Sequence, residues 1–259
     1  MIMQVTIDIN KSIEENAGIY YDKAKKLKKK IERAKEALQK TQKQIQLLEK
    51  KRSFEEKSKI IKPKRELSWY EKFRWFISSE GFLVIGGRDA TTNEIIIKKH
   101  TNTDDIVFHT EASGSPFFVI QTKGKKPGKA TLEEAAQAVA SYSRAWKLGI
   151  SSIEVFYVNP EQVSKKTKAG EYIQKGSFMI YGKKNFITPN LGVAIGITKD
   201  GIIMGGPTNA IKKNCPKFDI IEQGKEKTSK VAKQIQKEIG GELDEIIKVI
   251  PPGGVKVKE

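Results

Sequence analysis

The chain has 259 residues, with 48 lysines and arginines against 31 aspartates and glutamates, and a formal net charge of +17. This length suits one large domain or a domain with an appendage, and the charge favours an anionic partner, nucleic acid ahead of a membrane surface. One cysteine and two histidines exclude an internal disulfide and a Cys/His zinc site. Without a membrane-length apolar run or a signal-peptide pattern, we expect a soluble cytoplasmic protein with no cofactor.

Residues 1–58 are predicted to form a basic coiled-coil helix. From Ile13 to Arg52, apolar side chains recur in alternating steps of four and three, the 3.5-residue period of a coiled coil. One such helix, roughly 60 Å long, cannot bury its seam alone, so we expect a homodimer or a partner subunit. Lysines crowd its first half, which fits either a solubilising face or a basic arm along phosphates. A polar linker is expected at 59–66, where Pro63 stops a helix.

Residues 67–250 are predicted to form an α+β domain, a mixed sheet with packed helices, followed by a loose tail at 251–259. A helix is expected at 130–149, with Thr131 and Glu134 as a capping box and Gly149 as its stop. A short helix at 159–166 begins at the N-cap Asn159. A basic amphipathic helix is expected at 228–241. Expected strands lie at 81–87, 93–99, 105–111, 116–122, 151–158, 176–182 and 192–198.

No convincing catalytic motif stands out in the sequence. His109 lies on an expected strand near two aspartates, but a general base needs a partner within reach, and a packed or backbone-bonded histidine is the favoured interpretation. Arg88 and Asp89 follow a strand and a glycine pair. They predict either a buried ion pair that sets a turn or a guanidinium presented to phosphate, with the structural role slightly ahead.

Residues 161–187 hold six lysines and only two acids. Lysine pairs stand beside small or neutral polar residues, because Ser164 precedes Lys165 and Lys166, and Asn185 follows Lys183 and Lys184. Glycines let backbone amides approach phosphates, and serine and asparagine add neutral donors. This mixture suits recognition of a nucleic-acid backbone rather than the reading of bases.

Three separated segments, 68–99, 109–120 and 161–187, resemble in order the NFACT-R domain, the C-terminal RNA-binding domain of the NFACT proteins of ribosome-associated quality control. Residues 15–30 resemble the start of the coiled coil in those proteins. The resemblance implies an RNA-binding module that acts on ribosomal RNA in the large ribosomal subunit, or on tRNA. The chain departs from the family in starting almost at the coiled coil, without an NFACT-N domain. It also has Thr91-Thr92 where two glutamines are common, and Tyr181 where arginine is frequent.

By resemblance, the family's motif positions supply a set of candidate residues. They are Arg88, Asp89, Asn93, His109, Gln162, Ser164, Lys165, Gly170, Glu171, Ser177, Gly182, Lys183, Lys184 and Asn185. The lysines, Lys166 included, and Arg88 are expected to contact phosphates, whereas Gly170 and Glu171 shape a turn. Two alternatives remain open: an RNA-modification enzyme that uses His109, Asp89 or Glu171, and a coiled-coil scaffold.

Overall fold

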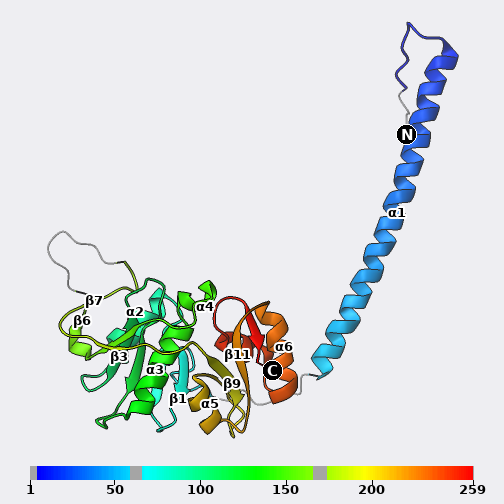
Figure 1. Cartoon of the computed structure of the whole chain (residues 1–259). Helices are drawn as coiled ribbons and strands as arrows, with labels where there is room; N and C mark the ends of the chain where they lie inside the picture. Colours follow the sequence, from blue (N-terminus) through cyan, green and yellow to red (C-terminus); the bar gives the residue numbers. More distant parts are fainter. Residues whose placement is uncertain (1–4, 59–65, 166–173, 259) are drawn as a thin grey trace. The chain divides into compact units, whose positions relative to one another are not determined.

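The computed structural model describes residues 5–58, 66–165 and 174–258. The chain divides into two compact units, residues 1–66 and residues 67–259 (Figure 1). The first unit is helical, and the second combines helices with antiparallel sheets, so the expected α+β fold preceded by a long helix is confirmed.

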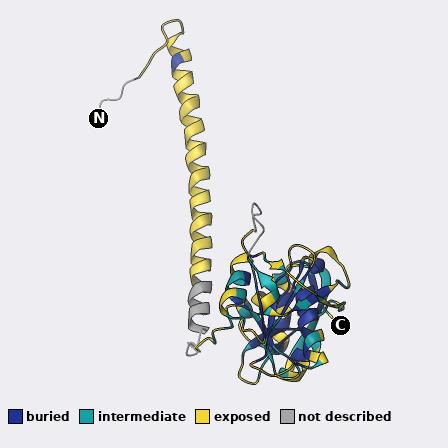
Figure 2. Ribbon diagram, turned by 90° about the vertical axis from the view of Figure 1, so that its left-hand side faces the viewer, coloured by how far each residue is buried: buried dark blue, intermediate teal, exposed yellow. Residues whose placement is uncertain are grey.

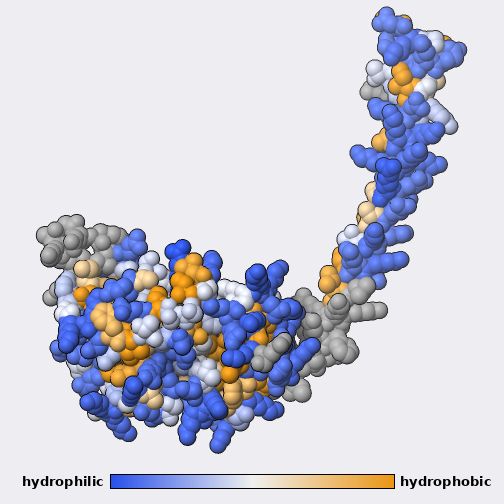
Figure 3. All heavy atoms as spheres, viewed as in Figure 1, coloured by the Kyte–Doolittle hydropathy of each residue, from blue (hydrophilic) through white to orange (hydrophobic). Residues whose placement is uncertain are grey.

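The first unit is one long helix, α1 (Ile13–Ser58). Ser12 and Glu15 cap its start reciprocally, because each side chain accepts a hydrogen bond from the other's backbone N–H, at 2.8 and 3.2 Å. The helix is exposed along almost all of its described length (Figure 2). Its surface is largely hydrophilic with scattered apolar side chains (Figure 3). Among these are the seam residues Leu27, Ile31, Leu38 and Ile45, about half of whose surface faces solvent, at 49 to 60%.

The segment before α1 folds back along the helix and is held by two of its side chains. The Asn16 amide nitrogen donates to the carbonyls of Asp8 (3.0 Å), Lys11 (3.3 Å) and Ser12 (3.0 Å), and its oxygen accepts from the Asp8 N–H (2.9 Å). One turn further, the Tyr20 hydroxyl bonds both backbone groups of Thr6. Asn16 is thereby buried on an otherwise exposed helix.

The second unit contains two main sheets. The larger has the strand order β1-β2-β4-β3-β5-β8, and every neighbouring pair is antiparallel. The smaller has the order β10-β9-β11-β12 and is also antiparallel. A short ribbon pairs β6 with β7. The strands are β1 (Arg74–Ile77), β2 (Leu83–Gly86), β3 (Ile106–Thr110), β4 (Phe118–Gln121), β5 (Val155–Val158), β6 (Val163–Ser164), β7 (Met179–Ile180), β8 (Asn185–Ile187), β9 (Val193–Ile197), β10 (Ile203–Gly206), β11 (Lys217–Glu226) and β12 (Val255–Val257).

Helices cover these sheets and complete one apolar core. Helix α3 (Lys129–Ser141) packs on β3, β4 and β5, and α6 (Thr228–Ile239) packs on the smaller sheet. Helix α5 (Thr208–Asn214) contacts strands of both sheets, β1 and β9 among them, and so joins the two. The others are α2 (Ala90–Lys99), α4 (Arg144–Leu148) and α7 (Leu243–Val249), with a 3-10 turn, η1, at Pro160–Gln162. The inward residues expected on the basic amphipathic helix, Val231, Ala232, Ile235 and Ile239, are all buried.

Four expectations about elements are wrong. Residues 93–99 belong to helix α2, because Asn93 and Ile96 are buried three residues apart, the spacing of a helix face rather than of a strand.

Thr131 does not cap the helix that starts at Lys129. Instead the Glu80 carboxylate, from the β1–β2 turn, accepts from the backbone N–H groups of Gly128 and Thr131, both at 3.1 Å.

That same helix is also interrupted where one continuous element was expected. It ends at Ser141, and Ser143 caps the separate helix α4 by accepting from the Ala145 N–H at 3.1 Å. Gly149 ends α4 in the left-handed conformation, with φ of 74°, as expected. The C-terminal residues form strand β12 on β11 rather than a loose tail.

Candidate nucleic-acid interface

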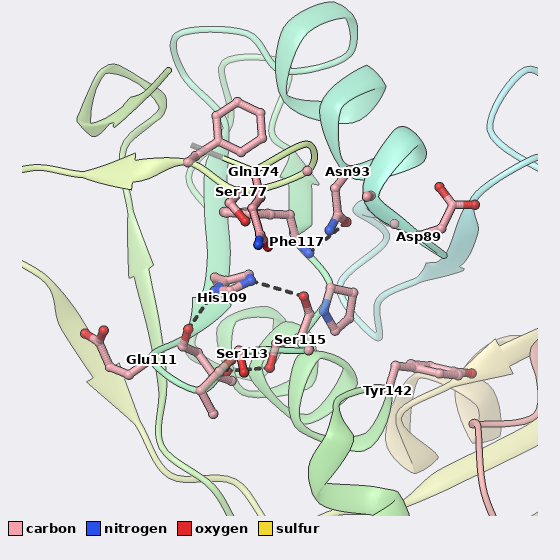
Figure 4. A pocket seen from close by; sticks show the side chains of 18 of the residues that line it. Asp89, Asn93, His109, Glu111, Ser113, Ser115, Phe117, Tyr142, Gln174 and Ser177 are labelled. Atoms are coloured by element: carbon pink, nitrogen blue, oxygen red, sulfur yellow. Dashed lines mark hydrogen bonds between the residues drawn. The ribbon is translucent and has the colours of Figure 1, made fainter. Parts of the chain in front are cut away.

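A cavity of about 750 Å³ brings together residues that lie far apart in the sequence. Its wall is built from the start of α2, the β3–β4 connection and residues 174–180, with Arg74 and Tyr142 also contributing (Figure 4). Six of the candidates taken from the family motif line it: Arg88, Asp89, Asn93, His109, Ser177 and Lys184. The sequence separates these residues by almost a hundred positions, and the antiparallel sheet places them around one hollow.

His109 is a structural part of the cavity wall. Its Nδ1 lies 2.6 Å from the Thr110 carbonyl oxygen and its Nε2 lies 3.1 Å from the Ser115 carbonyl oxygen (Figure 4). Its ring stacks on Phe117 with centroids 4.1 Å apart. Burial lowers the pKa of His109, while both carbonyl contacts oppose that change. A neutral ring can donate to only one of these two carbonyl oxygens, and both ring nitrogens face backbone groups rather than a side chain that could relay a proton.

Asp89 and Asn93 fix the start of α2 against the strand β4. Asp89 is the N-cap and accepts from the Thr92 N–H at 2.8 Å, and this hydrogen bond is the main cause of its lowered pKa. The Asn93 side-chain oxygen accepts from the Phe117 N–H at 3.2 Å. A Cβ atom on Gly87 would lie 1.8 Å from that oxygen, so glycine is required there for Asn93 to approach.

Arg88 makes no ion pair with Asp89 in the described part of the chain. Its guanidinium donates to the Phe73 carbonyl at 3.0 Å and to the Lys248 carbonyl at 3.2 Å. Arg74, on the neighbouring strand β1, places its guanidinium carbon 4.4 Å from the centre of the Tyr142 ring. Two guanidinium groups therefore stand at one end of the cavity.

Three lysines lie at or beside the cavity, and two of them are paired with acids. We call Lys165, Lys175 and Lys184 the lysine rim. The ammonium group of Lys165 lies 2.5 Å from a Glu94 oxygen and 4.8 Å from the centre of the Phe178 ring. Hydrogen bonding from Lys165 is the main cause that lowers the pKa of Glu94 to about 2. Lys184 lies 2.6 Å from a Glu111 oxygen and 4.7 Å from the centre of the Phe156 ring.

The remaining candidates lie beside the rim rather than in the cavity. Gln162 has a structural role, because its amide nitrogen donates to the carbonyls of Tyr181 (2.7 Å) and Lys183 (2.9 Å) and its oxygen accepts from the Asn159 N–H (3.0 Å). The turn held in this way contains Gly182, whose φ of 79° favours glycine.

Ser164 lies on β6, and Lys183 and Asn185 are exposed next to this turn. Lys166, Gly170 and Glu171 lie outside the described residues.

Arg74, Tyr142, Glu94 and Glu111 belong to this region and were not expected from the sequence. Arg74 carries a signal in retrospect, because it is a charged residue inside the aromatic strand sequence FRWFI. The two glutamates carry none, since sequence does not show which lysine a distant acid will meet. Among the described residues no group of three or more His, Cys, Asp or Glu side chains could hold a metal ion.

Comparison with known proteins links this region to RNA. Residues 72–182 match the family model described as the NFACT protein RNA binding domain. The chain is 43% identical over 213 residues to the archaeal Rqc2 homolog aRqcH of Methanocaldococcus jannaschii, an alignment that covers 79% of this chain and 31% of that protein. It is 44% identical over 131 residues to the human ribosome quality control complex subunit NEMF, covering 50% of this chain and 12% of NEMF.

The chain thus spans less than a third of the length of these relatives. Among solved structures, the C-terminal part of the fibronectin/fibrinogen-binding protein of Streptococcus suis aligns over 74% of this chain and 78% of its own. The alignment has 17% identity and a TM-score of 0.41, which is too weak to carry an argument. The matched range of the family model holds α2, His109, both cavity arginines and two of the three rim lysines, Lys165 and Lys175, whereas Lys184 lies just beyond it. Residues 72–182 of this chain therefore belong to the NFACT RNA-binding domain family.

Proposed function

We propose that this chain binds RNA as a non-catalytic module of ribosome-associated quality control, on the ribosomal RNA of the large subunit or on tRNA. The observation that carries the proposal is that the NFACT RNA-binding match covers most of the cavity wall together with Lys165 and Lys175. Relatives named as ribosome quality control subunits support the setting. Aromatic and amide groups around the rim suit contact with a flexible strand, and lysines suit its phosphates.

The balance of charge on the rim favours a reversible interaction. Glu94 and Glu111 each engage one lysine, so a phosphate must compete with a carboxylate for Lys165 and Lys184. Lys175 and Lys183 are exposed and have no ion pair within the described ranges. We expect these two to make the main phosphate contacts of the wild type, because Lys165 and Lys184 are held by their acids.

The module interpretation is favoured over an RNA-modification enzyme by the state of His109. Both ring nitrogens face backbone carbonyls, and the ring is stacked on Phe117. Asp89 is engaged as a helix cap. We therefore expect His109→Ala to act through stability and not through loss of a chemical step.

Sucrose-gradient sedimentation of a cell lysate tests the RNA-binding proposal. At low salt the wild type is expected to move with large ribosomal subunits or tRNA-sized RNA, and to return to the top at high salt. A variant with Lys165, Lys166, Lys183 and Lys184 changed to Ala should stay at the top. The control changes four exposed lysines of α5 and α6 to Ala, Lys212, Lys213, Lys233 and Lys237, which removes the same charge elsewhere. If the control and this four-lysine variant behave alike, only net charge matters and the site is wrong.

The exposed seam of α1 supports a second function, association with another helix. Leu27, Ile31 and Leu38 repeat on the helix with no covering element in the described first unit. We propose that a second copy of this chain, or a helix of a partner subunit, covers the seam. Analytical ultracentrifugation separates these cases: a concentration-dependent dimer that Leu27→Lys/Leu38→Lys abolishes indicates self-association. A monomer at all concentrations indicates a different partner.

In the described residues no helix is long and apolar enough to cross a membrane. In the scaffold alternative, the α1 seam mediates association and the chain has no surface that prefers RNA. It predicts a stable α1 dimer with equal affinity for RNA and heparin, and a filter-binding comparison of the two ligands distinguishes it from the module.

A further inference from the structure

Two guanidinium groups meet at the cavity end formed by β1, the start of α2 and Tyr142. The Arg74 guanidinium makes no hydrogen bond to any described residue, and neither the Arg74 nor the Arg88 guanidinium lies within 4.0 Å of a described carboxylate. The Nε atom of each is buried without a hydrogen-bond partner among the described residues. Two guanidinium cations therefore lie at one partly buried end of the cavity, and neither contacts a described carboxylate.

No described carboxylate forms an ion pair with these arginines, although Glu245 and Asp89 are near enough to oppose the lowering of the Arg88 pKa. Tyr142 lies against Arg74, but burial raises the pKa of Tyr142 to about 12, so its ring is uncharged near neutral pH. Its hydroxyl donates to the Val249 carbonyl at 2.7 Å. Burial lowers the pKa of both arginines, and the nearby Arg88 charge lowers that of Arg74 further. Partly buried cations without a counter-charge in contact are costly, and an oxyanion lowers that cost by accepting from both.

The rest of the cavity suits a base and sugar rather than a bare anion. Its volume of about 750 Å³ is far larger than a phosphate ion needs. Phe117, Phe156 and Phe178 supply apolar wall, and the Asn93, Gln174 and Ser177 side chains add amide and hydroxyl groups (Figure 4). The Asn93 amide nitrogen makes no hydrogen bond to a described residue, while its oxygen is held by Phe117. An amide fixed through one end is well placed to donate to a base edge.

We infer that the cavity binds one unpaired nucleotide, with its phosphate between Arg74 and Arg88 and its base toward Asn93. The inference deepens the proposed RNA-binding function and rests on it. A duplex cannot enter a concave site of this size, so the ligand is a strand end or a nucleotide turned out of its stack. The lysine rim then follows the neighbouring phosphates along the strand. We expect Arg74 to contribute more to phosphate binding than Arg88, because the Arg88 guanidinium already donates to two backbone carbonyls.

The test is an NMR titration of the full chain, labelled with nitrogen-15, using adenosine 5′-monophosphate, adenosine and inorganic phosphate as probes. The Nε–H signals of Arg74 and Arg88 and the side-chain amide of Asn93 report each part of the site separately. The monophosphate should shift all three saturably, inorganic phosphate only the arginines, and the monophosphate should bind about tenfold tighter than phosphate. Equal affinity for the monophosphate and phosphate overturns the nucleotide assignment, and so does the absence of any shift.

Variants decide whether the arginines carry the binding. Arg74→Gln should weaken binding of the monophosphate by about tenfold or more, and Arg74→Lys should lose less because it keeps the charge but not the planar fork. Lys212→Gln, at an exposed lysine of α5 outside the cavity, is the control for charge. Dispersion of the amide spectrum shows that each variant is folded. Unchanged affinity in folded Arg74→Gln overturns the inference.

The outcome is separable from that of the proposed function. If RNA cosediments and depends on the rim lysines while mononucleotides do not bind, the RNA-binding proposal stands and the cavity assignment falls. If the monophosphate binds through Arg74 but no RNA cosediments, the RNA-binding proposal falls and takes the strand-end ligand with it. Only rim-dependent RNA binding together with Arg74-dependent nucleotide binding supports both.

Discussion

Removing two acids is expected to strengthen RNA binding, because Glu94 and Glu111 hold the rim lysines in the free protein. Their oxygens lie 2.5 Å from the Lys165 ammonium and 2.6 Å from the Lys184 ammonium. Glu94→Gln/Glu111→Gln keeps an oxygen that can accept from the Gly176 N–H, a contact of 3.3 Å with Glu94, while it releases both cations. The released lysines are then free to contact phosphates that they do not contact while the carboxylates hold them.

The size of the effect follows from counterion release. Each phosphate contacted by a lysine adds about 0.7 to 0.9 to the slope of log affinity against log salt concentration. Two released lysines therefore steepen that slope by about 1.4 to 1.8. The ratio of the affinity at about 50 mM salt to the affinity at about 200 mM salt should then be about tenfold larger for the variant than for the wild type.

Fluorescence anisotropy of a labelled single-stranded RNA across a potassium chloride series measures both affinity and slope. The matched control is Glu222→Gln, because Glu222 pairs with Lys256 (3.4 Å) and Lys258 (3.0 Å) on the smaller sheet. It changes the net charge in the same direction but lies outside the proposed interface, so its slope should equal that of wild type. A double rim variant with an unchanged slope would refute the reasoning, and so would an equal gain in the control.

Three further predictions concern the fold. His109→Ala should lower the free energy of unfolding by about 2 to 4 kcal/mol in urea titrations, because it removes a ring stacked on Phe117; a loss below about 1 kcal/mol would contradict this packing role. Burial, and then the neighbouring Glu238, raise the pKa of Asp219 to about 6. The folded state therefore favours the protonated acid and loses stability as pH rises from about 4 to 6, so Asp219→Asn should raise the Tm by about 2 to 4 °C at pH 7.5 and hardly at pH 4. Burial also raises the pKa of Cys215 to about 11, so Ellman's reagent should react slowly with the native thiol and rapidly in urea; rapid reaction without urea would show that the site opens.

The sequence predicted much of the fold where local pattern and burial agree. Strands such as 81–87 and 105–111 were recognisable from β-branched and aromatic runs, and the amphipathic helix near the C-terminus from its period. Helix α2 was misread because three consecutive isoleucines favour a strand locally. The Asp89 cap and the burial of Asn93 and Ile96 outweigh that preference in the folded chain. A tertiary contact, the Glu80 carboxylate, likewise decided where α3 begins.

The candidate site was predicted in composition but not in geometry. The sequence pattern singled out lysine pairs and the resemblance singled out Arg88, Asp89, Asn93 and His109, yet neither shows that several of these side chains are already engaged. Arg88 bonds two carbonyls, Asp89 caps a helix, and Glu94 meets Lys165 across 71 positions. Partners at such separations depend on the sheet order, which composition and spacing do not contain. For the same reason the arginine pair that defines the cavity end became visible only in three dimensions.

The C-terminal strand β12 has a consequence for how the domain is cut for expression. Val255 and Val257 pair with β11, and the Trp146 ring nitrogen donates to the Gly254 carbonyl at 3.2 Å. A boundary placed before residue 254 would strip the outer strand and leave β11, ten residues long, as an open edge. Open edges pair with other chains, so such a shortened product would be prone to intermolecular strand addition. Strand β12 protects the edge of β11, so any fusion or tag is best attached beyond residue 258.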